Sequence, residues 1–189
     1  MLNKKYFRKV REELLSYAEK RRDVIKVAGD AQHLAKKAIF ALQRDENKAG
    51  EEGLGKASEM LRGLVKKYQS EAGIFEVGAF KAALEEYIEA RLFRDFVNGK
   101  SLDQIDELPV DSDAFVSGLC DVPGEIVRYA IKSAIERKFD EVKRCYDEAE
   151  KIIDELVDMD LTGYHRQKFD QAKQALNKLQ QIVYEVSLK

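Results

Sequence analysis

The spacing of hydrophobic residues predicts helices along almost the whole chain. Apolar positions recur every three or four residues, and no stretch alternates apolar and polar side chains as a half-buried strand would. We therefore expect an all-α fold of about seven helices in a single domain that spans residues 1–189. The expected helices cover, approximately, residues 4–44, 56–70, 75–98, a short segment within 101–109, 111–137, 139–159 and 164–188, and a loop rich in Gly, Lys and Glu covers 47–55.

The helix expected over residues 111–137 has a clear start and an irregular middle. Asp111 or Ser112 can cap its N-terminus with a side-chain oxygen. Further along, Pro123 and Gly124 weaken the helix, because proline lacks a backbone N–H and glycine is flexible. Two interpretations stay open at this point: a kink that frees a carbonyl beside Asp121, or a tolerated bend with no role.

Composition narrows the class of protein. Of the 189 residues 44% are hydrophobic and 36% are charged, which is typical of long amphipathic helices around a real core. The net charge is only −2, so any surface that binds nucleic acid has to be local. No apolar run reaches membrane-spanning length and the N-terminus lacks a signal-peptide run, so we expect a soluble, cytoplasmic protein with no membrane partner. Cys120 and Cys145 are expected to be reduced thiols in the core, because their spacing is not that of metal ligands.

One face of the first predicted helix is basic. Arg22, Lys26, His33, Lys37 and Arg44 fall within roughly 60° of one another around the helix axis. A basic stripe aligned over many turns can follow a phosphate backbone. A solvated helix face is the more common origin of such a stripe, and both interpretations are kept.

Two pairs of carboxylates lie in otherwise apolar helical segments. Glu86 and Glu89 are three residues apart, and Asp121 and Glu125 are four apart, so each pair shares a helix face. Buried like charges repel and lose hydration, so such a cluster usually persists because a cation or a proton satisfies it. All-oxygen ligation would suit Mg²⁺, with Mn²⁺ as the alternative. Ordinary ion pairing would explain the acids equally simply, and the candidate partners are Arg91, Arg94 and Arg128.

Other common chemistries find no support in the sequence. The two histidines, His33 and His165, do not follow a glutamate by three positions, as the ligands of a di-iron bundle would. No Ser-His-Asp or Cys-His arrangement is evident, and the glycines near residue 50 lack the Gly-Lys-Ser/Thr ending of a phosphate-binding loop.

The acidic segments resemble those of the translin family, specifically its TRAX (translin-associated factor X) branch. Leu84–Ala90 resembles the TRAX run Glu-Tyr-x-Glu-Ala, which supplies two catalytic glutamates, and Gly118–Arg128 resembles the TRAX stretch Asp-Leu-Thr-Gly-Glu-Leu-x-Arg. Translin itself has an Ala-Ser-Glu-Leu pattern in the second segment and lacks the aspartate. Less specific similarity covers Arg22–Val27, Lys37–Arg44 and Lys178–Leu188, and Pro123 stands where TRAX usually has threonine.

The resemblance implies a seven-helix chain that assembles into a closed, hollow octamer and holds RNA, or single-stranded DNA, on an inner basic surface. For TRAX-like members it implies Mg²⁺-dependent endoribonuclease activity. Carried over residue by residue, Glu86, Glu89 and Asp121 are the expected catalytic acids and metal ligands, and Glu125 is a fourth acid at the metal. On the basic stripe, the residues expected to bind nucleic acid are Arg22, Lys26, Lys37 and Arg44.

These features leave three hypotheses. The first is a homo-oligomeric, Mg²⁺-dependent endoribonuclease that acts on single-stranded RNA, and the presence of Asp121 favours it. The second is a catalytically inactive, translin-like oligomer that binds RNA or single-stranded DNA. The third is a structural oligomer whose acidic residues are all paired with arginines.

Overall fold

The chain folds into helices only, as expected. The computed structural model describes residues 1–71 and 73–188, and within these ranges it contains six α-helices, one short 3-10 helix and no strand. The elements are α1 (Lys4–Gln43), α2 (Asn47–Tyr68), η1 (Ile74–Glu76), α3 (Gly78–Val97), α4 (Ser112–Ile135), α5 (Phe139–Val157) and α6 (Gly163–Ser187).

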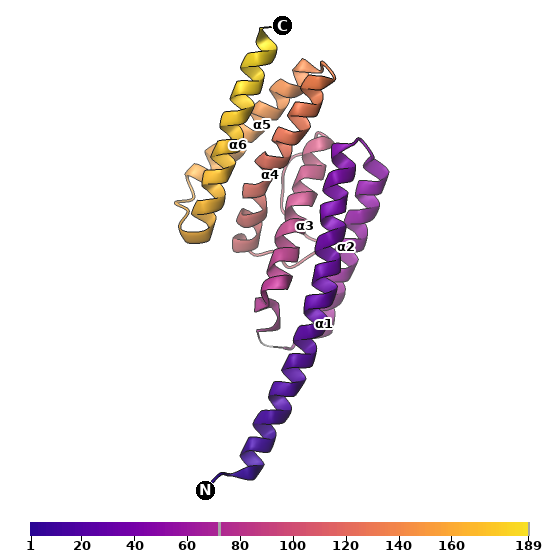
Figure 1. The fold of residues 1–189 in the computed structure, drawn as a ribbon, viewed down its shortest axis with the longest axis vertical. Helices are drawn as coiled ribbons and strands as arrows, with labels where there is room; N and C mark the ends of the chain where they lie inside the picture. The colour runs from indigo at the N-terminus through magenta and orange to yellow at the C-terminus, as the bar shows by residue number, and fades with distance from the viewer. Residues whose placement is uncertain (72, 189) are drawn as a thin grey trace.

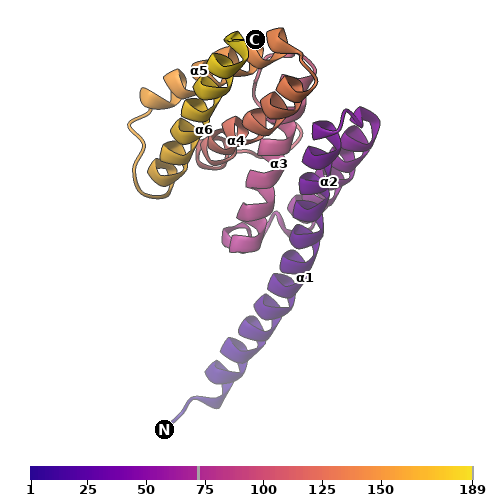
Figure 2. The same ribbon diagram turned by 45° about the horizontal axis from the view of Figure 1, so that its top comes forward.

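The helices form two groups that meet at the contact between α3 and α4. On one side α1 packs against α2 and α3, and on the other α4 packs against α5 and α6 (Figures 1 and 2). The N-terminal part of α1 extends alone beyond the other helices, and its first buried residue is Val24. The core therefore runs through the inner part of α1 and across α3 and α4.

The glycine-rich segment after α1 is part of α2, so the expected loop over 47–55 is wrong. Gly50 and Gly53 lie against α1, where a Cβ atom on Gly50 would come within 2.8 Å of Leu42 Cγ and one on Gly53 within 3.2 Å of Ala38 Cβ. The glycines thus allow α1 and α2 to approach closely. Their cost in helix propensity is offset by packing, which local sequence does not reveal.

The short helix expected within 101–109 does not form, which reduces the number of α-helices from seven to six. Residues 101–105 have no regular structure and 106–109 form turns, and the segment is held by the buried side chains of Ile105 and Leu108. Glu107 adds a polar anchor, because it accepts hydrogen bonds from Tyr87 Oη at 2.8 Å and Arg91 Nε at 3.1 Å. Tertiary contacts therefore override the local capping signal.

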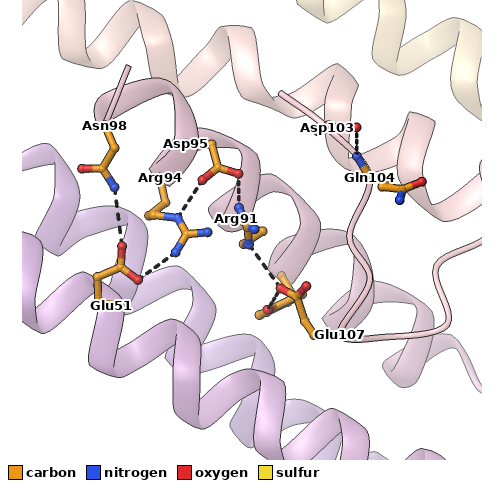
Figure 3. A network of polar contacts seen from close by, with 9 residues as sticks. Glu51, Arg91, Arg94, Asp95, Asn98, Asp103, Gln104 and Glu107 are labelled. Atoms are coloured by element: carbon orange, nitrogen blue, oxygen red, sulfur yellow. Dashed lines mark hydrogen bonds and ion pairs between the residues drawn. The ribbon is translucent and has the colours of Figure 1, made fainter. Parts of the chain in front are cut away.

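Arg91 and Arg94 belong to a polar network at the C-terminal end of α3. Figure 3 shows both guanidinium groups beside Asp95, which is 5% exposed. Arg94 Nε lies 3.0 Å from Asp95 Oδ1, and Arg94 Nη1 donates to Glu51 at 2.8 Å. The network ties α3 to α2 and, through Glu107, to the segment after α3.

The predicted start of α4 is confirmed. Asp111 is the N-cap, and its Oδ1 accepts a hydrogen bond from the Ala114 N–H at 2.8 Å. The helix includes Pro123 and continues to Ile135, so proline does not end it. Because proline has no backbone N–H, Pro123 cannot donate a helical hydrogen bond to the Leu119 carbonyl, which lies two residues before Asp121.

Candidate catalytic site

A glycine sets the distance between the two helices that carry the acidic pairs. A Cβ atom on Gly118 of α4 would lie 2.5 Å from Ile88 Cγ2 and 3.0 Å from the Glu85 carbonyl oxygen of α3. Further along, Phe93 of α3 meets Tyr129 of α4, so the two helices run in the same direction. Close, parallel packing brings the acids of α3 to the level of the acids of α4.

The four predicted acids form one electrostatic cluster, with Glu89 at its centre. Burial raises the pKa of Glu89 to about 9, and the negative charges of Asp121, Glu125 and Glu86 act in the same direction. At neutral pH Glu89 therefore holds a proton. The roles of these residues as metal ligands and catalytic acids stay predictions.

Asp121 is held by a lysine from α6. Lys168 Nζ lies 2.5 Å from Asp121 Oδ2, and it also lies 3.1 Å from Glu85 Oε2. Burial raises the pKa of Asp121, although the Lys168 ammonium opposes this. Burial lowers the pKa of Lys168, but the hydrogen bonds and charges of its two carboxylate partners more than compensate, so the amine stays protonated.

Glu125 and Glu86 each have a partner as well. Glu125 is 7% exposed, accepts a hydrogen bond from Gln43 Nε2 at 3.1 Å and lies 2.7 Å from Arg128 Nη1. Gln43 Nε2 also donates to the Glu125 carbonyl at 2.8 Å. Glu86 lies 3.5 Å from Lys36 Nζ, and this lysine side chain is 56% exposed. Glu125 is thus firmly oriented, and Glu86 is only loosely paired.

The arginine explanation of the acids is right for one residue and wrong for two. Arg128 does pair with Glu125, whereas Arg91 and Arg94 pair with the acids of the network in Figure 3. The partners that sequence reasoning missed come from distant segments and have no local signal. They are Lys36 and Gln43 of α1 and Lys168 of α6.

The basic stripe on α1 is exposed, as predicted. Arg22, Lys26, Lys37 and Arg44 are all exposed, and within residues 1–71 and 73–188 none of them forms an ion pair. Lys37 and Arg44 are next in sequence to the two α1 residues that touch the acids. Arg22 lies about 20 Å further along the axis from Lys36, at 1.5 Å per residue.

The chemistry of the acidic cluster fits a hard divalent cation. It offers only carboxylate oxygens, the ligands that Mg²⁺ prefers, and a dication would relieve the repulsion that raises the pKa of Glu89. In the described part of the chain no three His, Cys, Asp or Glu side chains already converge on a common point. Metal binding would therefore require these side chains to turn from their present partners.

A serine, a histidine and an aspartate meet near the cluster but do not form a catalytic triad. His165 Nε2 lies 3.0 Å from Ser117 Oγ and 3.5 Å from Asp113 Oδ1. A triad needs the serine and the aspartate on different ring nitrogens, and here both face the same one. Ser117 is also fully buried, which closes it to a substrate.

These observations define an all-α protein with a partly buried carboxylate cluster between two parallel helices. The chain belongs to the translin family, whose family model matches residues 19–189. No curated protein matches it significantly. A membrane-spanning helix is absent from residues 1–71 and 73–188.

Solved structures similar to this chain carry the same fold. The structure titled AfC3PO – duplex RNA complex has a TM-score of 0.89 at 25% identity, covering 97% of both chains. A crystal structure of AfC3PO has the same TM-score at 26% identity, again with 97% of both chains covered. Apo-NeC3PO has a TM-score of 0.87 at 20% identity over 98% of both chains, which supports the fold alone.

Proposed function

We propose that this protein is a TRAX-like, Mg²⁺-dependent endoribonuclease of the cytoplasm that cuts single-stranded RNA and acts as a homo-oligomeric shell. The observation that carries the proposal is that Glu86, Asp121 and Glu125 lie close enough to partly buried Glu89 for their negative charges to raise its pKa. Four acids at one partly desolvated site destabilise one another, and a bound cation would compensate their repulsion and lost hydration. Membership of the translin family supports the same reading.

Each acid has a role that its surroundings suit. Glu86, Glu89 and Asp121 would hold the cation, and Glu125, fixed by Gln43 and Arg128, would act as a ligand or orient the others. Bound Mg²⁺ would polarise the phosphodiester and lower the pKa of an attacking water. A carboxylate freed from its partner can accept the proton of that water.

The exposed face of α1 would hold the RNA backbone. Lys37 and Arg44 each directly follow an α1 residue that contacts the acids, and Arg22 and Lys26 extend the charge toward the free end of the helix. Phe40, which is 48% exposed, lies on α1 between the two residues that touch the acids. An exposed aromatic ring can stack on an unpaired base, and this favours single-stranded RNA as the substrate.

The N-terminal part of α1, which extends beyond the other helices, supports oligomer formation. Its exposed apolar side chains include Phe7, Leu14 and Tyr17, which a second copy of the chain would cover. The family resemblance points to an octamer. The duplex RNA complex of AfC3PO supports RNA as a ligand of the present chain, and single-stranded DNA is a further candidate.

Cleavage of end-labelled single-stranded RNA tests the proposal directly. The wild type should cut RNA with Mg²⁺ or Mn²⁺ and not with EDTA, and Glu86→Ala and Asp121→Ala should abolish cutting while RNA binding persists. Glu155→Ala, at an exposed acid of α5, is the control and should cut normally. A correctly assembled wild type that binds several RNAs and cuts none would instead support the alternative function, an inactive RNA- or single-stranded-DNA-binding oligomer.

A further inference from the structure

Lys168 is a buried cation whose hydrogen-bonding capacity is fully used. The residue is 9% exposed, and its Nζ lies 2.5 Å from Asp121 Oδ2, 3.1 Å from Glu85 Oε2 and 3.2 Å from the Ser117 carbonyl oxygen. An ammonium group has three N–H donors, and here three acceptors surround it. Lys168 therefore already compensates the charge of Asp121 from within the chain.

The second lysine at the cluster is different in kind. Lys36 lies 3.5 Å from Glu86, and its side chain is 56% exposed, so solvent screens this pair. Of the two lysines, only Lys168 is itself buried, and its partner Asp121 is partly buried, with a side chain that is 31% exposed.

A divalent cation at Asp121 would meet the Lys168 ammonium at short range. Two positive groups that share one carboxylate repel each other, and this repulsion is strong where water is excluded. Glu85 offers Lys168 an alternative ion-pair partner, because its carboxylate already lies 3.1 Å from Nζ and is not one of the four clustered acids. Lys168 can thus stay paired with Glu85 and the Ser117 carbonyl after it releases Asp121.

We propose that Lys168 is a positioning residue that holds Asp121 in the metal-free protein and releases it when the cation binds, so that it sets the metal affinity of the site. The inference rests on the proposed function and adds a regulation of the same site. Lys168 competes with the metal for Asp121. When no metal is present, its ion pair with Asp121 stabilises the folded acidic cluster.

The test is direct measurement of Mn²⁺ binding by electron paramagnetic resonance, without RNA. Lys168→Met removes the competing charge and should tighten Mn²⁺ binding about tenfold or more, because a buried positive neighbour within contact of Asp121 is lost. Lys168→Gln should act in the same direction while it retains hydrogen-bond donors at this position, and Lys168→Arg, which keeps the charge, should bind like the wild type. Lys36→Met makes the same charge change at the exposed pair and should alter binding less than about threefold.

A thermal readout separates this role from a purely structural one. Without metal, Lys168→Gln should melt at a lower temperature than the wild type, and saturating Mn²⁺ should raise its melting temperature by more than it raises that of the wild type. Weaker or unchanged Mn²⁺ binding in both Lys168→Met and Lys168→Gln would overturn the competition and leave the proposed function standing. Failure of the wild type and of every variant to bind Mn²⁺ would overturn both, whereas binding by the Lys168→Gln protein alone would support the competition in its strongest form.

Discussion

Gly118 packs against Ile88 so closely that a methyl group at Gly118 would lie 2.5 Å from the Ile88 Cγ2 atom. The same methyl group would lie 3.0 Å from the Glu85 carbonyl oxygen, which belongs to the backbone and moves only with the helix. Gly118→Ala should therefore force α3 and α4 apart and destabilise the protein by about 2 kcal/mol, as overpacked cores do. Urea unfolding measures the loss, and the RNA cleavage rate should fall with it because the acidic pairs separate.

Gly124 supplies the control for that substitution within the same helix. It is exposed, and a Cβ atom there meets nothing within 4 Å. Gly124→Ala should be neutral or stabilising by up to about 1 kcal/mol, because alanine is the better helix former. Equal destabilisation by both substitutions would contradict the close-packing explanation.

Asp95 should matter for stability and not for chemistry. It is buried between Arg91 and Arg94 (Figure 3), and the ion-pair partners of these arginines do not include any of the four clustered acids. Asp95→Ala leaves two guanidinium groups short of a partner and should cost about 3 kcal/mol of unfolding free energy. Glu51→Ala removes a half-exposed partner of Arg94 and should cost less than about 1 kcal/mol. Mn²⁺ affinity should be unchanged in both variants, and a large change would place this network in the site.

Glu89 should make the metal-free protein less stable as the pH rises. Its ordinary pKa of 4.5 is raised to about 9 in the folded state, so above pH 4.5 the folded chain binds more protons than the unfolded chain. Stability then falls between about pH 4.5 and 9 and levels off beyond, since Glu89 is charged in both states there. Glu89→Gln should remove this slope and be more stable than the wild type by several kcal/mol at pH 9, about 6 kcal/mol if the whole shift counts, with no gain at pH 4. Unfolding in EDTA at a series of pH values measures the difference.

The basic stripe should govern RNA affinity and its salt dependence. Replacing Arg22 and Lys26 together by glutamine removes two exposed charges that have no ion-pair partner in the described ranges. RNA binding should weaken, and the slope of log affinity against log salt should become shallower by about one to two units. Lys143→Gln with Lys178→Gln, two exposed lysines of α5 and α6, keeps the same net charge change and should leave the slope unaltered.

The two thiols should be inert in the folded protein. Burial raises the pKa of Cys120 to about 11 and that of Cys145 to about 12, and both side chains are free and buried. At pH 8 a thiol reagent should therefore label neither residue in minutes, and it should label both after denaturation. Rapid labelling of the native protein would show that the packing around α4 or α5 opens readily.

Periodicity was sufficient to predict most of the helices, because a helix needs only its own backbone hydrogen bonds and one apolar face. The failures at residues 47–55 and 101–109 share a cause. Glycine at close helix contacts and apolar residues in a buried turn depend on neighbours far away in the chain. Local propensity carries no record of those neighbours.

The sequence by itself determined that the fold is all-α, that α1 carries an exposed basic face, and that Glu86, Glu89, Asp121 and Glu125 pair by helical spacing. Spacing within one helix is fixed by 3.6 residues per turn, so these statements need no tertiary information. Only the tertiary structure decided which charges compensate the acids. Lys168 reaches Asp121 across 47 residues of chain, and Arg91 and Arg94 turn to another acid although they are closer to the cluster in sequence. Helix packing and the cost of burying an unpaired charge determine which ion-pair partners form.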